Sequence, residues 1–136
     1  MPKLTPNFNS SEFKCPVGGE VPPDLFPNLQ SLAHSLQALR DALGRPITII
    51  SGYRSPEYNK KIDGAKLSQH MFARAADIKV HGMTPVEVHR AVEGLIADGR
   101  MGQGGLGLYK TFVHYDVRGG RARWFGDGVS AADLVS

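Results

Sequence analysis

The chain has 136 residues, of which 41% are hydrophobic and 21% charged, and its formal net charge is +3. These values are typical of one folded domain with a packed core and argue against disorder. No apolar run approaches the roughly 18–20 residues that span a bilayer, and the N-terminus lacks the apolar region of a signal peptide. The basic residues are scattered, which argues against a nucleic-acid-binding surface. The single cysteine, Cys15, excludes an intramolecular disulfide and is expected to be a small buried side chain.

The first third of the chain changes from proline-rich to helical. Residues 1–28 contain six of the nine prolines, which predicts an extended lead-in with turns. A helix is expected next, because leucines recur at spacings of three and four residues and form one apolar stripe. The stripe consists of Leu29, Leu32, Leu36, Leu39 and Leu43. Gly44 fits the C-cap position of this helix, and Pro46 prevents its continuation.

Two apolar runs in the middle of the chain predict short strands, at 47–50 and 75–80. Between them a short helix is expected at 57–62, with Ser55 as its N-cap. Alternation along the second strand places Asp77 on one face and the apolar side chains of its neighbours on the other.

A second amphipathic helix is expected at 85–97, where Thr84 and Glu87 have the spacing of a capping box. The chain then changes to short strands joined by brief, glycine-containing connections, which favours antiparallel hairpins. These strands are expected at 105–109, 112–117 and 122–125.

This order of elements predicts an α+β fold, with an antiparallel sheet and helices packed on one side of it. The whole chain, 1–136, is interpreted as a single domain, with residues 126–136 as a peripheral tail.

Three residues have the chemistry of a metal site: His70, Asp77 and His114. Two imidazoles and one carboxylate are a ligand set of catalytic zinc sites, in which a fourth position stays open. If the strands that carry Asp77 and His114 are neighbours, both side chains can converge with His70 on one ion. Each residue alone has a structural alternative: a histidine is more often a hydrogen-bonded structural residue, and Asp77 alone fits a turn or a cap.

Two further residues would complete a hydrolytic site. Alternation along the strand places Asp116 on the same face as His114, which makes Asp116 the nearest candidate for a general base. Arg54 has the planar donors that stabilise an oxyanion or hold a substrate carboxylate. For Asp116 the alternative is an ion pair with Arg118 or Arg121.

Four motifs, taken together, resemble a known family. The chain carries Ser51-Gly-Tyr-Arg-Ser-Pro56, Ser68-Gln-His70, Ala75-Ala-Asp77 and Phe112-Val-His114-Tyr-Asp116. In this order they resemble the zinc D-Ala-D-Ala carboxypeptidases and murein endopeptidases of peptidoglycan, which share a fold with the hedgehog signalling domain. The resemblance extends over residues 4–124, nearly the whole chain.

The resemblance implies one bound zinc ion. Its ligands by position are His70, Asp77 and His114. Arg54 matches the arginine that contacts the substrate or the oxyanion, and Ser68 and Tyr53 match residues that support the site.

The chain departs from the family pattern at two positions. Several relatives place the catalytic acid three residues before the last histidine, where this chain has Thr111, so Asp116 is the best substitute, either as the base or as a group that orients a ligand. The family's glycine between the first two ligands is Ala73 here. That glycine is needed either for a positive φ or for its small side chain, and the intact ligand set favours the second explanation.

The sequence therefore predicts a zinc metallopeptidase that cuts the peptide part of peptidoglycan. The alternative is a non-catalytic cell-wall or protein-binding module of the same fold with a structural metal, for example in a phage virion. We expect a monomer that acts at the bacterial cell wall, encoded by a phage as an endolysin or released by another route. A carboxypeptidase and an endopeptidase would share these residues.

Overall fold

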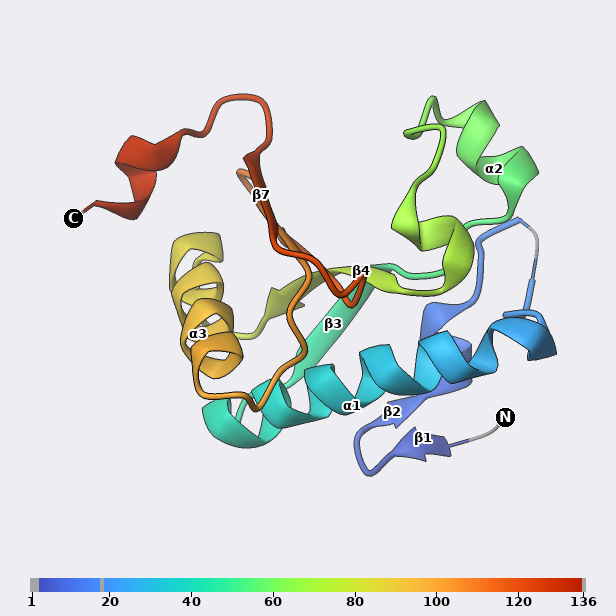
Figure 1. Ribbon diagram of the computed structural model, residues 1–136, viewed down its shortest axis with the longest axis horizontal. Helices are drawn as coiled ribbons and strands as arrows, with labels where there is room; N and C mark the ends of the chain where they lie inside the picture. The colour runs from blue at the N-terminus through green and yellow to red at the C-terminus, as the bar shows by residue number, and fades with distance from the viewer. Residues whose placement is uncertain (1–2, 18, 136) are drawn as a thin grey trace.

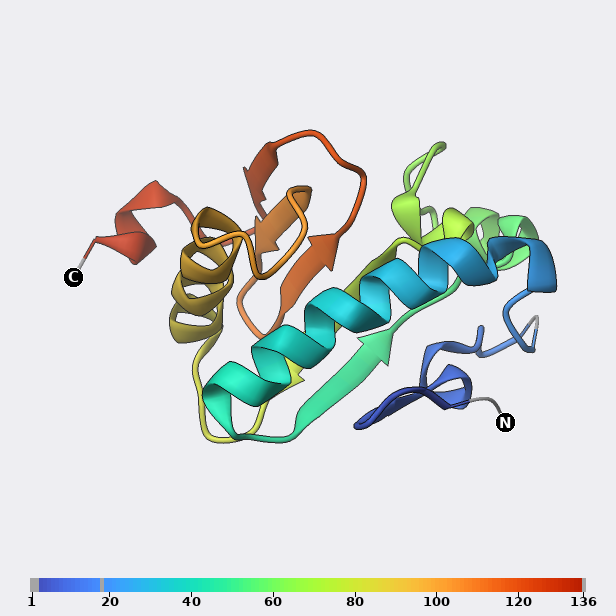
Figure 2. The ribbon, with the colours of Figure 1, turned by 60° about the horizontal axis from the view of Figure 1, so that its bottom comes forward.

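The computed structural model describes residues 3–17 and 19–135 and has the expected α+β architecture. Its central sheet has the strand order β3-β4-β6-β5-β7. These strands are β3 (Ile47–Ser51), β4 (Ala75–Val80), β5 (Gly105–Leu108), β6 (Val113–Asp116) and β7 (Ala122–Phe125). Helices α1 (Phe26–Leu43) and α3 (Pro85–Ala97) contact each other and share one hydrophobic core with the sheet (Figures 1 and 2). The short helix α2 (Pro56–Lys61) lies at the end of the molecule opposite α3 (Figure 1).

Helix α1 buries the predicted leucine stripe. Leu29, Leu32, Leu36 and Leu39 are fully buried, whereas Leu43 packs against the core from a partly buried position. The helix begins at Phe26, earlier than the first leucine of the stripe, because Pro27 in its first turn favours helix initiation. Gly44 ends it with φ 63°, the left-handed conformation that glycine adopts without a steric penalty.

The starts of the other two helices follow their predicted caps. Ser55 Oγ accepts a hydrogen bond from the backbone N–H of Tyr58 at the start of α2. At α3, Thr84 and Glu87 form the reciprocal capping box, in which each side chain accepts from the other residue's backbone N–H.

The last strand corrects the sequence prediction. The spacing favoured a hairpin between β6 and β7, but β7 pairs in parallel with β5 at the edge of the sheet. Both edges of β6 are already occupied, because β4 and β5 each pair with it in antiparallel orientation. Strand β7 therefore takes the free edge of β5, and the connection after β6 crosses over β5 to reach it.

The N-terminal region also has more regular structure than an extended lead-in. Strands β1 (Lys3–Thr5) and β2 (Phe8–Asn9) form a two-stranded antiparallel pair, followed by 3-10 turns at Ser10–Phe13 and Pro23–Leu25. Phe8 and Phe13 are buried in the common core, as is Cys15. Burial of these side chains stabilises the packing of this proline-rich segment against the sheet. Met1, Pro2 and Gly18, which belong to the predicted lead-in, lie outside the described residues.

The C-terminal tail contains one 3-10 turn, Ala131–Leu134, after β7. Arg90 of α3 donates a hydrogen bond to the backbone carbonyl of Leu134, whose side chain packs against the core. Within the described residues, no helix combines the length and apolar character required to cross a membrane.

One row of residues crosses all five strands and positions two residues of the predicted metal site. The strand register places Ser51 opposite Asp77, Asp77 opposite His114, His114 opposite Gly107, and Gly107 beside Trp124. Because side chains alternate along a strand, Asp77 faces away from the core that Ile78 and its apolar neighbours share with α1 and α3. Asp77 and His114 thus lie on the sheet face that the two long helices leave uncovered.

Candidate metal centre

The structure brings His70, Asp77 and His114 together as one buried group. Each offers a ligand atom, and these atoms all lie within 4.8 Å of one another. Asp77 Oδ1 lies 3.3 Å from His70 Nε2 and 3.1 Å from His114 Nδ1. Tetrahedral zinc with bonds of about 2.0–2.1 Å separates its ligand atoms by about 3.3 Å. The spacing and the donor types therefore suit one small cation.

The backbone around His70 fixes its imidazole. Nδ1 lies 2.7 Å from the carbonyl oxygen of Gly52, and because a carbonyl only accepts hydrogen bonds, Nδ1 must carry the proton. Nε2 is then the free nitrogen that faces Asp77. Ser68 Oγ accepts from the N–H of His70, and the N–H of Arg54 donates to the His70 carbonyl. Ser68 and the loop after β3 thus hold the turn that presents this imidazole.

His114 is fixed by a carboxylate on its own strand. Its Nε2 lies 2.8 Å from Asp116 Oδ2, while Nδ1 is the nitrogen that faces Asp77. When Nε2–H donates to the charged Asp116, Nδ1 is left as the free lone pair directed at the centre.

Asp116 is completely buried and its oxygens accept several hydrogen bonds. Oδ1 accepts from the backbone N–H groups of Gly105 and Arg118 and from Arg118 Nε, and Oδ2 accepts from Arg118 Nη2 at 2.7 Å. Burial raises the pKa of this carboxyl, but the hydrogen bonds from His114, Arg118 and Gly105 outweigh it and hold the pKa well below its ordinary value. Asp116 is therefore a charged group whose lone pairs are already engaged.

The other two electrostatic shifts favour a positive charge at the centre. Burial raises the pKa of Asp77, but hydrogen bonds from His114 and His70 lower it by more, so this carboxyl is ionised. Burial lowers the pKa of His114, and its hydrogen bonds to Asp116 and Asp77 overcome that effect and raise it. The two carboxylates thus stabilise a cation between them, either a proton on the imidazole or a metal ion.

Glycines in β5 make room for this arrangement. A Cβ at Gly105 would lie 2.3 Å from Asp116 Oδ2, and one at Gly107 would lie 2.5 Å from Trp124 Nε1. Glycine at these two positions lets the carboxylate reach the β5 backbone and lets the indole approach His114, with ring centroids 4.9 Å apart. The alternating glycines at 105 and 107 in the predicted strand are the sequence signal for the space on this face of the sheet.

A cleft of about 450 Å³ lies over the three ligand candidates. Arg54 and Arg118 both line it. Arg54 approaches Asp77 Oδ2 at 3.4 Å, and Arg118 lies with its guanidinium carbon 5.3 Å from the centre of the Trp124 ring. Among the described residues that line this cleft, Asp77 is the one carboxylate. The cleft is thus rich in cationic groups and suits a substrate with negative charge.

An aromatic wall, which was not predicted from the sequence, forms one part of the cleft. It consists of Tyr109, Phe112 and Trp124. The rings of Tyr109 and Phe112 stack with centroids 4.4 Å apart, and Trp124 Nε1 donates to the Tyr109 hydroxyl. Tyr53, predicted to support the site, lies instead in the hydrophobic core and does not line this cleft.

The backbone of Ala73 differs from what the sequence predicted for the position where the family has a glycine. It ends the 3-10 turn Gln69–Phe72 with φ 56° and ψ 31°, and its side chain is buried. The position therefore does require a positive φ, and the preferred explanation, a need for a small side chain alone, is wrong. For an L-residue this conformation costs roughly 1–2 kcal/mol, which the surrounding packing offsets.

Replacing Ala73 by valine is expected to lower the free energy of unfolding by about 2–3 kcal/mol, because a β-branched side chain fits neither the left-handed backbone nor the filled core. Replacement by glycine should change it by less than about 1 kcal/mol, since relief of strain is opposed by greater chain entropy and the loss of a buried methyl group. Urea unfolding of the three proteins measures both effects. Equal stabilities for the alanine and valine proteins would contradict the strained backbone.

Two comparisons with known proteins bear on this site. A model of the family described as Peptidase M15 matches residues 6–116, which includes all three ligand candidates. The zinc D-Ala-D-Ala carboxypeptidase of Streptomyces albus G is 48% identical to the chain over 44 residues. That match covers 32% of this chain and 17% of the relative, so the chain spans only a small part of the relative's length.

Proposed function

The chain belongs to the peptidase M15 family, and we propose that it is a zinc-dependent peptidase that hydrolyses peptide bonds in the stem or cross-link of bacterial peptidoglycan. The convergence of His70, Asp77 and His114 at ligand spacing carries this proposal. The partial similarity to a zinc D-Ala-D-Ala carboxypeptidase supports both the metal and the substrate class. We further propose a monomer that acts at the cell wall, since one chain supplies the ligand set and the cleft.

In this proposal His70 Nε2, a carboxylate oxygen of Asp77 and His114 Nδ1 hold the zinc ion. Zinc with an open coordination position lowers the pKa of a bound water to about 7 and polarises a carbonyl group. The protein contributes the fixed tautomers of both histidines, through Gly52 and Asp116, so that each presents a lone pair without rearrangement.

Asp116 acts in this proposal as a positioning residue rather than as the base considered from its sequence position. A base must reach the water that it deprotonates. Asp116 is fully buried, does not line the cleft, and its oxygens accept from His114, Gly105 and Arg118. Its charge and its hydrogen bond to Nε2 are instead suited to orient His114.

Arg54 is proposed to hold the substrate carboxylate or the developing oxyanion. Its side chain lines the cleft, and its contacts to Ser51 Oγ at 3.3 Å and Asp77 Oδ2 at 3.4 Å are both long. These weak contacts leave a guanidinium that can exchange partners when an anion binds.

Replacing Arg54 by lysine is expected to lower kcat/KM by about 10–100-fold, because lysine keeps the charge but loses the planar fork. Zinc affinity should stay within about threefold, since Arg54 is not a ligand. Steady-state kinetics and a zinc-binding titration on the same protein measure the two effects. An unchanged kcat/KM would contradict the assigned role.

Mass spectrometry of muropeptides tests the proposed function. Purified sacculi incubated with the zinc-loaded protein should release fragments with defined mass changes, and the His114→Ala protein should release none. Loss of a terminal D-Ala identifies a carboxypeptidase, whereas cleavage of stems or cross-links identifies an endopeptidase. Intact sacculi after incubation with fully zinc-loaded protein would sink the enzyme proposal and favour a binding module.

A further inference from the structure

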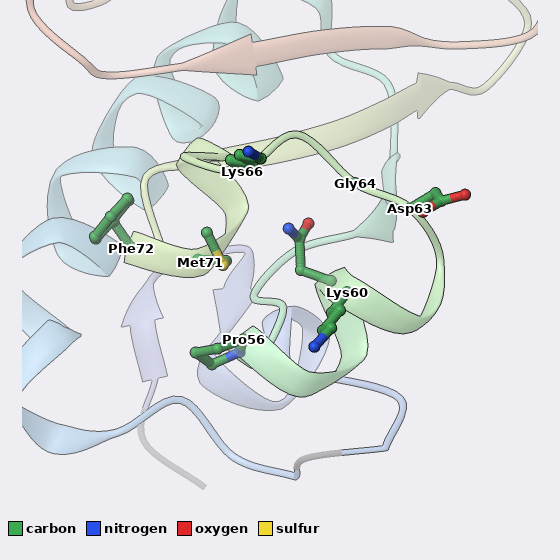
Figure 3. Close-up of a pocket in the computed structure, with 8 residues that line it drawn as sticks. Pro56, Lys60, Asp63, Gly64, Lys66, Met71 and Phe72 are labelled. Atoms are coloured by element: carbon green, nitrogen blue, oxygen red, sulfur yellow. The ribbon is translucent and has the colours of Figure 1, made fainter.

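A second and larger cavity, of about 630 Å³, lies beside the metal cleft between α2 and the segment 63–72 (Figure 3). Its volume is within the range of about 300–1,000 Å³ typical of ligand-binding pockets. The exposed surface of its lining is mainly apolar, with contributions from Pro56, Met71 and Phe72. Nothing in the proposed hydrolysis uses this cavity.

The segment that ends at His70 separates the two cavities. Ala65 and Leu67 line the metal cleft, whereas Lys66 lines the second cavity. These residues lie in a turn that is closed by a hydrogen bond from the Ser68 N–H to the Ala65 carbonyl. His70 faces the metal centre, and Met71, the next residue, lines the second cavity. A ligand in the second cavity would therefore pack against the back of the segment that presents a metal ligand.

The polar groups around the cavity favour an anion. Lys60 and Lys66 are exposed and line it, together with one acidic residue, Asp63. The carboxylate of Asp63 points away from the apolar residues Met71 and Phe72 (Figure 3). An apolar surface next to two ammonium groups matches a ligand that carries both an aliphatic side chain and a carboxylate.

The turn that shapes this wall is held by Asn59, a buried residue of α2. Its Nδ2 donates to the Ala65 carbonyl at 2.8 Å, and its backbone carbonyl accepts from Gly64 N–H. A Cβ at Gly64 would lie 2.0 Å from Asn59 Oδ1, so glycine is needed for this close approach. The contacts of Asn59 and Gly64 thus hold this wall of the cavity in place without a ligand.

We propose that this cavity is a second binding site for an anionic stem peptide of the wall polymer, separate from the peptide in the metal cleft. The identity of the ligand rests on the proposed function, because stem peptides combine alanine methyl groups with free carboxylates. A polymer that presents several stems can occupy both sites of one molecule, and the second contact raises the effective concentration of the first. The site therefore favours cross-linked or polymeric substrate over a single free peptide.

An NMR titration with the synthetic stem tripeptide L-Ala-γ-D-Glu-meso-diaminopimelate tests the site. The zinc-loaded full chain should show shifts of the Met71 methyl and Phe72 ring signals that saturate with the peptide. The Lys60→Glu/Lys66→Glu protein should bind at this site about tenfold more weakly, because two favourable charge contacts become repulsive. Shifts confined to the Trp124 signals of the metal cleft would overturn the proposal.

A charge-matched control separates local contacts from net charge. Lys14 and Lys61 are exposed and do not line the cavity, although Lys61 directly follows Lys60 on α2. The Lys14→Glu/Lys61→Glu protein should keep the wild-type affinity for the tripeptide, and equal weakening in both double variants would overturn the site. If charge reversal prevents folding, as judged by circular dichroism, Lys60→Gln/Lys66→Gln replaces it with an expected loss of about threefold.

The same titration distinguishes this inference from the proposed function. Shifts of Met71 and Phe72 in a protein that leaves sacculi intact would keep the second site and reject the peptidase. Cleavage of sacculi without those shifts would keep the peptidase and reject the second site.

Discussion

Replacing Asp77 by asparagine is expected to abolish peptidase activity and to lower zinc affinity by at least about 100-fold. Asp77 is the anionic member of the proposed ligand set, and its Oδ1 lies within 3.3 Å of both histidines. Asparagine keeps the size of the side chain but removes the charge that stabilises a cation beside His70 and His114. Competition with a chromophoric chelator measures the affinity, and muropeptide mass spectrometry measures the activity.

Asp127 provides the matched control for this substitution, since it is exposed and does not line the metal cleft. The Asp127→Asn protein should retain both zinc affinity and activity. A retained affinity within about threefold in the Asp77→Asn protein would contradict the ligand assignment. Removal of the metal from the wild-type protein with a chelator should abolish activity in the same way, and added zinc should restore it.

Replacing Asp116 by asparagine is expected to lower zinc affinity by roughly 10–100-fold and the free energy of unfolding by about 3 kcal/mol. The affinity falls because His114 loses the anionic acceptor that fixes its tautomer. The stability falls because Arg118 and the Gly105 N–H lose a fully buried charged partner. Chelator competition and urea unfolding measure these two quantities independently.

Activity at saturating zinc distinguishes a positioning role for Asp116 from a catalytic base. If Asp116 only orients His114, the Asp116→Asn protein should recover most of its kcat once its metal site is filled. Loss of a general base instead lowers kcat by about 10²–10⁴-fold at any zinc concentration. A deficit of that size in the fully loaded variant would show that the buried carboxylate does take part in proton transfer.

The arrangement of charge connects the site to its proposed substrate. Asp77 and Asp116 are offset by Arg54 and Arg118, so a bound divalent cation leaves the cleft with a net positive charge. Such a field favours peptides that carry a carboxylate close to the scissile bond. The proposed second site repeats this preference with Lys60 and Lys66 on the far side of the same segment.

Much of the fold follows from local sequence signals. The leucine stripe predicted α1, and Thr84 with Glu87 predicted the start of α3, because both depend on contacts within a few residues along the chain. The position of β7 did not follow from the sequence. It depends on which strand edge is free, and that is decided by the pairing of β6 with β4 and β5.

Ala73 illustrates why local reasoning failed at one position. Alanine in a sequence gives no sign of a left-handed backbone, because isolated alanine avoids it. The tertiary structure imposes φ 56° there, since the turn Gln69–Phe72 must end sharply between His70 and β4.

The sequence by itself determined which metal-binding groups this protein has: two imidazoles and a carboxylate, in motifs that are typical of one family. Only the tertiary structure decided which groups Asp116 contacts. The sequence left three roles open for Asp116: a general base, a group that orients a ligand, or the ion-pair partner of an arginine. In the folded protein the carboxylate is buried and accepts hydrogen bonds from the Gly105 N–H and the Arg118 guanidinium. It also lies at hydrogen-bond distance from the His114 imidazole. Of these partners, Gly105 lies on another strand, so its contact with Asp116 depends on the register of β5 against β6. Register is a property of the folded sheet rather than of any one strand.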